Sequence, residues 1–91
     1  MIINYIHDSA MTGTKEIYRW EGKKLQLVRK GDIIWDETNP DILVLRIAQT
    51  DPEWGELTVI HTRSQDVNTA SEAEILSMHQ ERDTLLFEGL E

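Results

Sequence analysis

The 91-residue sequence contains no cysteine. Disulfides, thiolate metal sites, iron–sulfur clusters and cysteine nucleophiles are therefore excluded. The chain also lacks any apolar run close to the roughly 20 residues that a membrane-spanning helix needs. Its first residues, MIINYIHDSA, lack the basic leader and apolar segment of a secretory signal. We therefore expect a soluble, cytoplasmic protein, either of a bacterium or of a phage-infected cell.

The motifs of common enzyme and cofactor sites are missing as well. There is no glycine-rich phosphate loop, no Walker lysine motif, no HExxH and no GxSxG. The three histidines, His7, His61 and His79, are far apart, and no pair has the spacing of metal ligands. The sequence therefore predicts a non-enzymatic protein with no catalytic residue, no cofactor and no metal ion.

Basic residues become scarce after residue 30. The chain has 17 acidic and nine basic residues, a net charge of −8. Residues 1–30 have six basic and three acidic residues, residues 31–65 have two and seven, and residues 66–91 have one and seven. This charge disfavours direct binding of nucleic acid, whose phosphates it repels, and suits a protein partner with a basic surface.

Alternating and apolar segments separated by turn residues predict strands over most of the chain. We expect one domain, residues 1–91, that is β-rich over 1–65 and has a helix at about 71–88. Sequential hairpins predict an α+β fold: an antiparallel meander of about five strands, twisted or partly barrel-like, with one C-terminal helix. Residues 42–48 are expected to form the central strand, covered on both faces, and Gly31 is expected to interrupt a strand.

Strict alternation predicts which strand residues share a face. It places Leu25 and Leu27 on one face with Lys30 on the other, and it places Leu57, Val59 and His61 together.

The predicted helix has a recognisable start. Ser71 followed by Glu74 is a capping-box pattern. A weaker alternative ends the helix near Arg82 and makes TLLFEG a final strand.

The stretch DIIWDETNPD, residues 32–41, holds four carboxylates around one tryptophan. Two of these acids could form an acid–base pair or hold a hard cation. However, the spacing is not that of an EF-hand loop, and Asp and Asn beside a proline are typical of an exposed turn. We interpret the stretch as a strand end, a turn and the start of the next strand.

A second acidic turn, TDPEWGE, contains Trp54, which could anchor a partner. Our leading hypothesis is a small acidic protein-binding module, an inhibitor of the phage anti-defence or nucleic-acid-mimicking kind, that binds a basic surface. The alternatives are a small-ligand or cation-binding β-barrel and a structural or homo-oligomeric subunit. The candidate partner-binding residues are Asp32, Asp36, Glu37, Asp41, Asp51, Glu53, Trp54, Glu56, Glu72 and Glu74.

Overall fold

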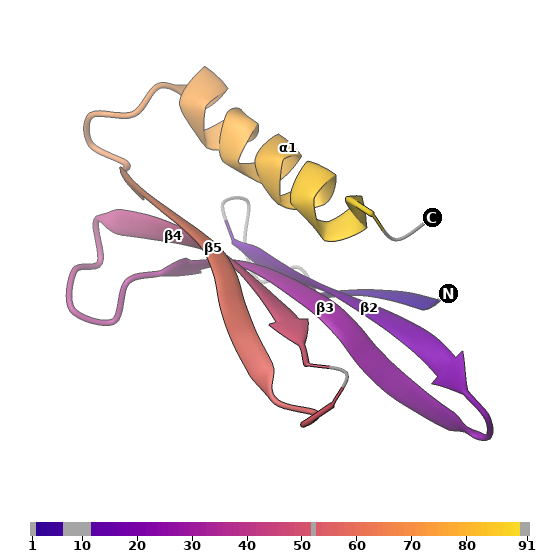
Figure 1. Cartoon of the computed structure of the whole chain (residues 1–91). Helices are drawn as coiled ribbons and strands as arrows, with labels where there is room; N and C mark the ends of the chain where they lie inside the picture. Colours follow the sequence, from indigo (N-terminus) through magenta and orange to yellow (C-terminus); the bar gives the residue numbers. More distant parts are fainter. Residues whose placement is uncertain (1, 7–11, 52, 90–91) are drawn as a thin grey trace.

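The computed structural model describes residues 2–6, 12–51 and 53–89 and contains one antiparallel sheet and one helix (Figure 1). The strands follow one another in the sheet in chain order, and the sheet is open rather than closed into a barrel. This arrangement confirms the α+β prediction. The elements are β1 (Ile2–Ile6), β2 (Gly13–Glu21), β3 (Lys24–Trp35), β4 (Ile42–Thr50), β5 (Leu57–Asp66) and α1 (Glu72–Phe87).

The turn residues act as their chemistry predicts. Glu21 pairs with Lys24, so β2 and β3 are joined by a two-residue loop whose first residue, Gly22, has a φ of +63°. A glycine with positive φ at this position is the requirement of a type II′ hairpin, whose twist matches that of the strands.

Helix α1 begins where the capping box predicts. The Ser71 Oγ accepts a hydrogen bond from the Glu74 N–H at 3.2 Å, and the Ser71 hydroxyl lies 3.4 Å from the Glu74 carboxylate. The helix then continues to Phe87, which confirms the single helix over a final strand at residues 84–88. In the part of the chain that the structure describes, no helix is long and apolar enough to cross a membrane.

One face of the sheet, here called the covered face, packs against α1. The helix contributes residues four apart, Met78 and Leu86 with Arg82 between them, and lies over β3 and β4. Burial of this apolar cluster is the main favourable contribution to folding. The fully buried apolar side chains are Ile17, Ile33, Leu43, Leu45, Ile47, Met78 and Leu86.

Gly31 does not interrupt a strand, contrary to expectation. Strand β3 runs through it, and the residue lies directly beneath α1. A Cβ atom at this position would be 2.8 Å from the Arg82 Cγ and 3.0 Å from the Leu86 side chain. The glycine is therefore needed for close approach of the helix, a contact that no local pattern reveals.

The C-terminal end of α1 is capped by a residue of the sheet. Arg29 is almost fully buried. Its guanidinium donates to the carbonyls of Leu85, Leu86 and Glu88 at 2.7–3.1 Å, and to Gln49 Oε1 at 2.9 Å. The last turn of the helix contains no basic residue. Arg29 thus satisfies carbonyls that have no partner within the helix and places a cation at the negative end of its dipole.

Ion pairs join the sides of α1 to the sheet. Lys15 Nζ lies 2.9 Å from Asp83 Oδ1, and Arg63 Nη1 lies 3.0 Å from Glu81 Oε2. Burial alone would raise the pKa of Asp83, but the hydrogen bond from Lys15 and the charges of Arg82 and Lys15 outweigh it, so this pKa lies below its ordinary value.

The position of β4 differs in part from expectation. On its covered face Leu43, Leu45 and Ile47 are fully buried, and Val44 and Ala48 on the other face are nearly so, but Arg46 is exposed. The middle strand of the sheet is β3, because the meander places the third of five strands at the centre. Strand β4 lies one position from the edge.

Candidate partner-binding surface

The first acidic turn, between β3 and β4, is stabilised by its own polar side chains. Asp36 Oδ1 accepts hydrogen bonds from the Thr38 N–H at 2.8 Å and from the Thr38 hydroxyl at 2.9 Å, and Asn39 Oδ1 accepts from the Asp41 N–H at 3.0 Å. The backbone and hydroxyl hydrogen bonds from Thr38 lower the pKa of Asp36 below its ordinary value. This carboxylate therefore has a structural role in the turn, as Asp commonly does.

The second acidic turn, between β4 and β5, has the same construction. Asp51 Oδ1 accepts from the Glu53 N–H at 2.7 Å and from the Trp54 N–H at 3.1 Å. The Gly55 N–H donates to the Asp51 carbonyl at 2.8 Å, with Gly55 at a φ of +71°. The result is a tight turn that holds Trp54 away from the core, with 78% of the side chain exposed.

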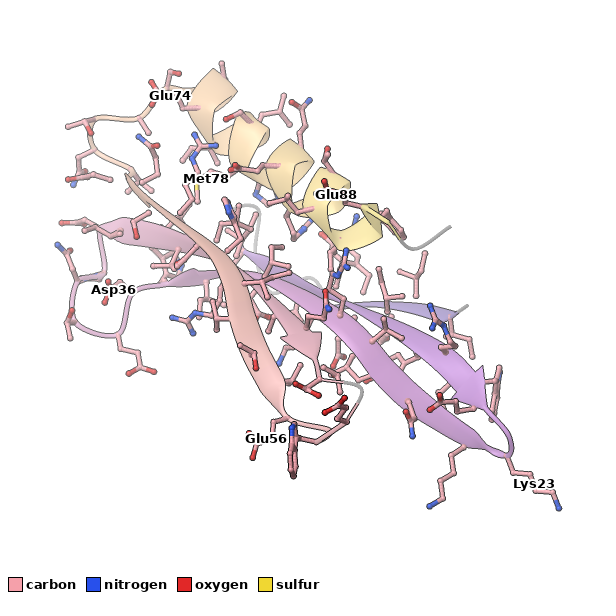
Figure 2. All side chains as sticks on the ribbon, in the orientation of Figure 1. Lys23, Asp36, Glu56, Glu74, Met78 and Glu88 are labelled. Carbon is pink, nitrogen blue, oxygen red and sulfur yellow. The ribbon has the colours of Figure 1, made fainter. Side chains whose placement is uncertain are left out.

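The two acidic turns lie at opposite ends of the sheet, because consecutive turns of a meander alternate between its ends. The molecule measures 47 Å along its longest axis. The Val67 N–H donates to the Asp41 carbonyl at 2.9 Å, and Gln65 donates to Glu74 Oε2 at 3.0 Å, so the start of α1 lies at the same end as the first turn. Figure 2 shows Asp36 and Glu74 towards this end and Glu56 towards the other.

Nine of the ten residues predicted from the sequence therefore form two groups rather than one patch. The acidic end, as we call it, has Asp36, Glu37 and Asp41 in the first turn and Glu72 and Glu74 at the helix start. The hairpin end, which also holds the loop between β2 and β3, has the remaining turn residues. These are Asp51, Glu53, Trp54 and Glu56.

Asp32 belongs to neither group. It lies within β3 on the face opposite α1, where it accepts a hydrogen bond from the Thr14 hydroxyl at 2.8 Å and pairs across the ladder with Arg46. Its partners are those of a satisfied cross-strand acid on a half-buried surface.

Two bulges decide which residues reach this uncovered side of the sheet, here called the open face. In β3 the register changes after the pair Ile17–Arg29, so that Leu27 pairs with Tyr18. The extra residue is Val28, and it brings Leu27 and Lys30 to the same face, contrary to strict alternation.

The bulge in β5 has a similar effect. His61 pairs with Ile47 on the covered face, whereas Val59 pairs with Ala48 on the open face, and Ile60 is the extra residue. The expectation that His61 shares a face with Leu57 and Val59 is therefore wrong. His61 Nε2 instead lies 3.4 Å from Glu81 Oε1 on the helix, at ion-pair distance but without hydrogen-bond geometry.

With these registers, apolar side chains gather on the open face at the hairpin end. Cross-strand pairs connect them: Ile2 pairs with Tyr18, Tyr18 with Leu27, and Trp20 with Leu25. At the edge of the sheet, β5 contributes two more on the same face, Leu57 opposite Thr50 and Val59 opposite Ala48. Several are about half exposed, and we call this set the open-face patch: Ile2, Trp20, Leu25, Leu57 and Val59.

A notch separates the β2–β3 hairpin from the β4–β5 hairpin at this end. The pairing of β3 with β4 stops at Arg29 and Gln49, beyond which the two hairpins separate. The space between them is about 390 Å³ and is lined by side chains of both, including Arg19, Glu21 and Trp54. The hairpin end therefore has a protruding tryptophan, a recess between the two hairpins and, on the open face, the open-face patch.

The described residues provide no metal site. Within 2–6, 12–51 and 53–89, no three His, Asp or Glu side chains are placed to hold an ion. His7 lies outside the described residues. Comparisons of the chain with models of protein families, with curated proteins and with solved structures give no significant match.

Proposed function

We propose that the protein is a non-enzymatic module that binds another protein through its hairpin end, with Trp54 as the anchor. The main support is the exposure of Trp54 at the same end of the sheet as the open-face patch. Together these side chains expose on the order of several hundred Å² of apolar surface. That area approaches the roughly 800 Å² per partner of a standard protein–protein interface.

The chemistry of the partner follows from the charges around Trp54. Glu53 and Glu56 flank it, and residues 47–60 contain no lysine or arginine. A partner with an apolar pocket rimmed by basic residues would match this surface, because complementary charge speeds association and selects among partners. An inhibitor that covers a basic, nucleic-acid-binding groove is the form of this function that the net charge of −8 favours.

In this proposal the acidic end does not contact the partner at the anchor. It lies at the other end of a molecule 47 Å long, whereas charges separated by more than about 8 Å are largely screened at physiological salt. Its acids would contribute to long-range attraction at low salt.

A capture experiment tests the proposal. The protein would serve as bait in lysate of its host, beside the variants Trp54→Ala and Trp35→Ala; Trp35 lies at the end of β3 towards the acidic end. A tryptophan anchor is worth about 2 kcal/mol or more, which is roughly a thirtyfold loss of affinity. We expect Trp54→Ala to lose the captured protein and Trp35→Ala to retain it.

Charge reversal separates the two ends. Replacing Glu53 and Glu56 by lysine should slow association and weaken its dependence on salt, whereas the same change at Asp36 and Glu37 should have a smaller effect. A complex that is insensitive to salt, or equally sensitive to both pairs of reversals, would contradict the proposal.

A second candidate function, binding of a small ligand, rests on the notch of about 390 Å³. Its lining combines a tryptophan with charged side chains, as ligand sites often do. A thermal-shift screen with nucleotides, divalent cations and common metabolites tests it. An increase in Tm that Trp54→Ala abolishes would favour this function, and no increase at high ligand concentration would exclude it.

A further inference from the structure

The outer edge of β5 has no neighbouring strand among the described residues. Strand β5 is last in the order of the sheet, and its ten residues are twice the length of β1 at the opposite edge. Helix α1 lies over β3 and β4 and leaves this edge uncovered (Figure 1). Such an edge presents backbone donors and acceptors that another strand can pair with.

The hydrogen bonds of the inner ladder show which amides face outwards. The Val67 N–H donates inwards to the Asp41 carbonyl at 2.9 Å. Because backbone groups alternate along an antiparallel strand, the N–H groups of Gln65 and Arg63 also point inwards. Those of Ser64 and Thr62 therefore point outwards, and both residues have exposed side chains.

Strand β5 has few of the features that usually protect a free edge. It contains no proline and no lysine. Arg63 is turned towards α1, where it pairs with Glu81 at 3.0 Å. The bulge at Ile60 is the one protective feature, and Leu57, Val59 and Ile60 remain about half exposed beside it. This half of the edge is apolar and includes Leu57 and Val59 of the open-face patch.

A second copy of the chain is a poor occupant of this edge. In full antiparallel self-pairing Leu57 would face Asp66, Val59 would face Ser64, and the apolar half of each strand would meet the polar half of the other. Each copy also carries a net charge of −8, so association brings like charges together.

We propose that β5 adds an extended segment of the partner protein as a sixth, edge strand. This inference rests on the proposed function, because it names how the same partner extends its contact from Trp54 along the sheet. The segment would place apolar side chains against Leu57–Ile60 and basic side chains near its ends, where Glu56 precedes β5 and Asp66 closes it. Backbone hydrogen bonds supply affinity in this mode, and side chains at alternate positions supply specificity.

A synthetic peptide provides the first test. The probe is a ten-residue peptide of alternating valine and threonine with two lysines at each end, and the readout is hydrogen exchange of individual amides. We expect it to slow exchange at Thr62 and Ser64. Protection at β1 instead, or none at millimolar peptide, would overturn the inference, as would protection of β5 that rises with protein concentration in the absence of peptide.

Edge variants provide the second test. Ser64→Pro removes an outward N–H without breaking the inner ladder, since proline is tolerated on the solvent side of edge strands. We expect at least tenfold weaker peptide binding by Ser64→Pro and unchanged binding by Ser64→Ala, with both variants folded by circular dichroism.

The protein captured from lysate distinguishes the two proposals. If Trp54→Ala releases it but Ser64→Pro does not, the proposed function stands and the strand-addition inference fails. If neither variant releases it, both fail.

Discussion

The covered and open faces of the sheet both carry apolar side chains, but these differ in how far they are buried. On the covered face, aliphatic side chains are fully buried beneath α1, and the charged residues at its margins are paired with the helix. On the open face at the hairpin end, side chains of the same chemical type remain about half exposed. Composition alone therefore does not distinguish a face that the helix buries from one that stays exposed. The two faces differ in whether helix α1 packs against them.

The largest expected effect contrasts Leu45 with Val59. Leu45→Ala removes a fully buried side chain from the covered face and should lower the free energy of unfolding by about 2–5 kcal/mol. Val59→Ala, on the open face, should cost less than about 1 kcal/mol. Urea denaturation of both variants measures the difference, and equal losses would show that the two faces are not distinct in stability.

The next effect concerns the capping of α1. Arg29→Leu leaves three helix carbonyls without their donor and should destabilise the protein by about 2–3 kcal/mol. The control is Arg19→Leu, because Arg19 is exposed and lies two residues after Ile17 on the same face of β2. This variant should change stability by less than about 0.5 kcal/mol. Faster amide exchange at the end of α1 in the Arg29 variant alone would identify the cause, and similar stabilities of the two variants would contradict it.

A smaller effect is expected where the helix meets Gly31. Gly31→Ala places a methyl group against Arg82 and Leu86 and should cost about 1–3 kcal/mol. In a double-mutant cycle with Leu86→Ala the two losses should be less than additive by at least about 0.5 kcal/mol, because the smaller side chain makes room. Strict additivity would mean that the close approach is not what limits position 31.

The smallest effect comes from Asp83. Its pKa is lowered in the folded protein, so its contribution to stability is present above the ordinary pKa near 4 and is lost as pH falls through the lower, folded value. The pair with Lys15 is partly exposed, so at pH 7 the contribution should be below about 1 kcal/mol. Asp83→Asn should flatten the decline of stability between about pH 5 and pH 3, as should Lys15→Met. An unchanged decline in both variants would exclude this pair as its source.

Much of the fold could be predicted because its signals are local. The five strands and their turns follow from period-two alternation and from residues such as Gly22 and Asp51, each of which acts within a few positions of itself. The helix start at Ser71 is equally local. The faces of β3 and β5 could not be predicted, since one extra residue at Val28 and at Ile60 reverses the alternation beyond it.

The candidate site divides in the same way. The acidic turns and the turn position of Trp54 follow from Asp, Asn, Pro and Gly in the sequence. The open-face patch does not, because it combines residues from four strands whose common face depends on both bulges. In the sequence, the only signal of this patch is the presence of apolar residues at alternate positions of β2 and β5. That pattern is typical of buried strands as well.

The sequence by itself determined the absence of thiol chemistry, the charge, the α+β class with its C-terminal helix, the positions of the turns and the start of the helix. The tertiary structure decided that the two acidic turns lie apart and that one apolar surface stays uncovered. It also decided that Gly31 packs against the helix and that Arg29 caps its C-terminal end. The physical reason is range. Turns and caps are fixed by hydrogen bonds between near neighbours, whereas register and cover depend on pairing between residues tens of positions apart.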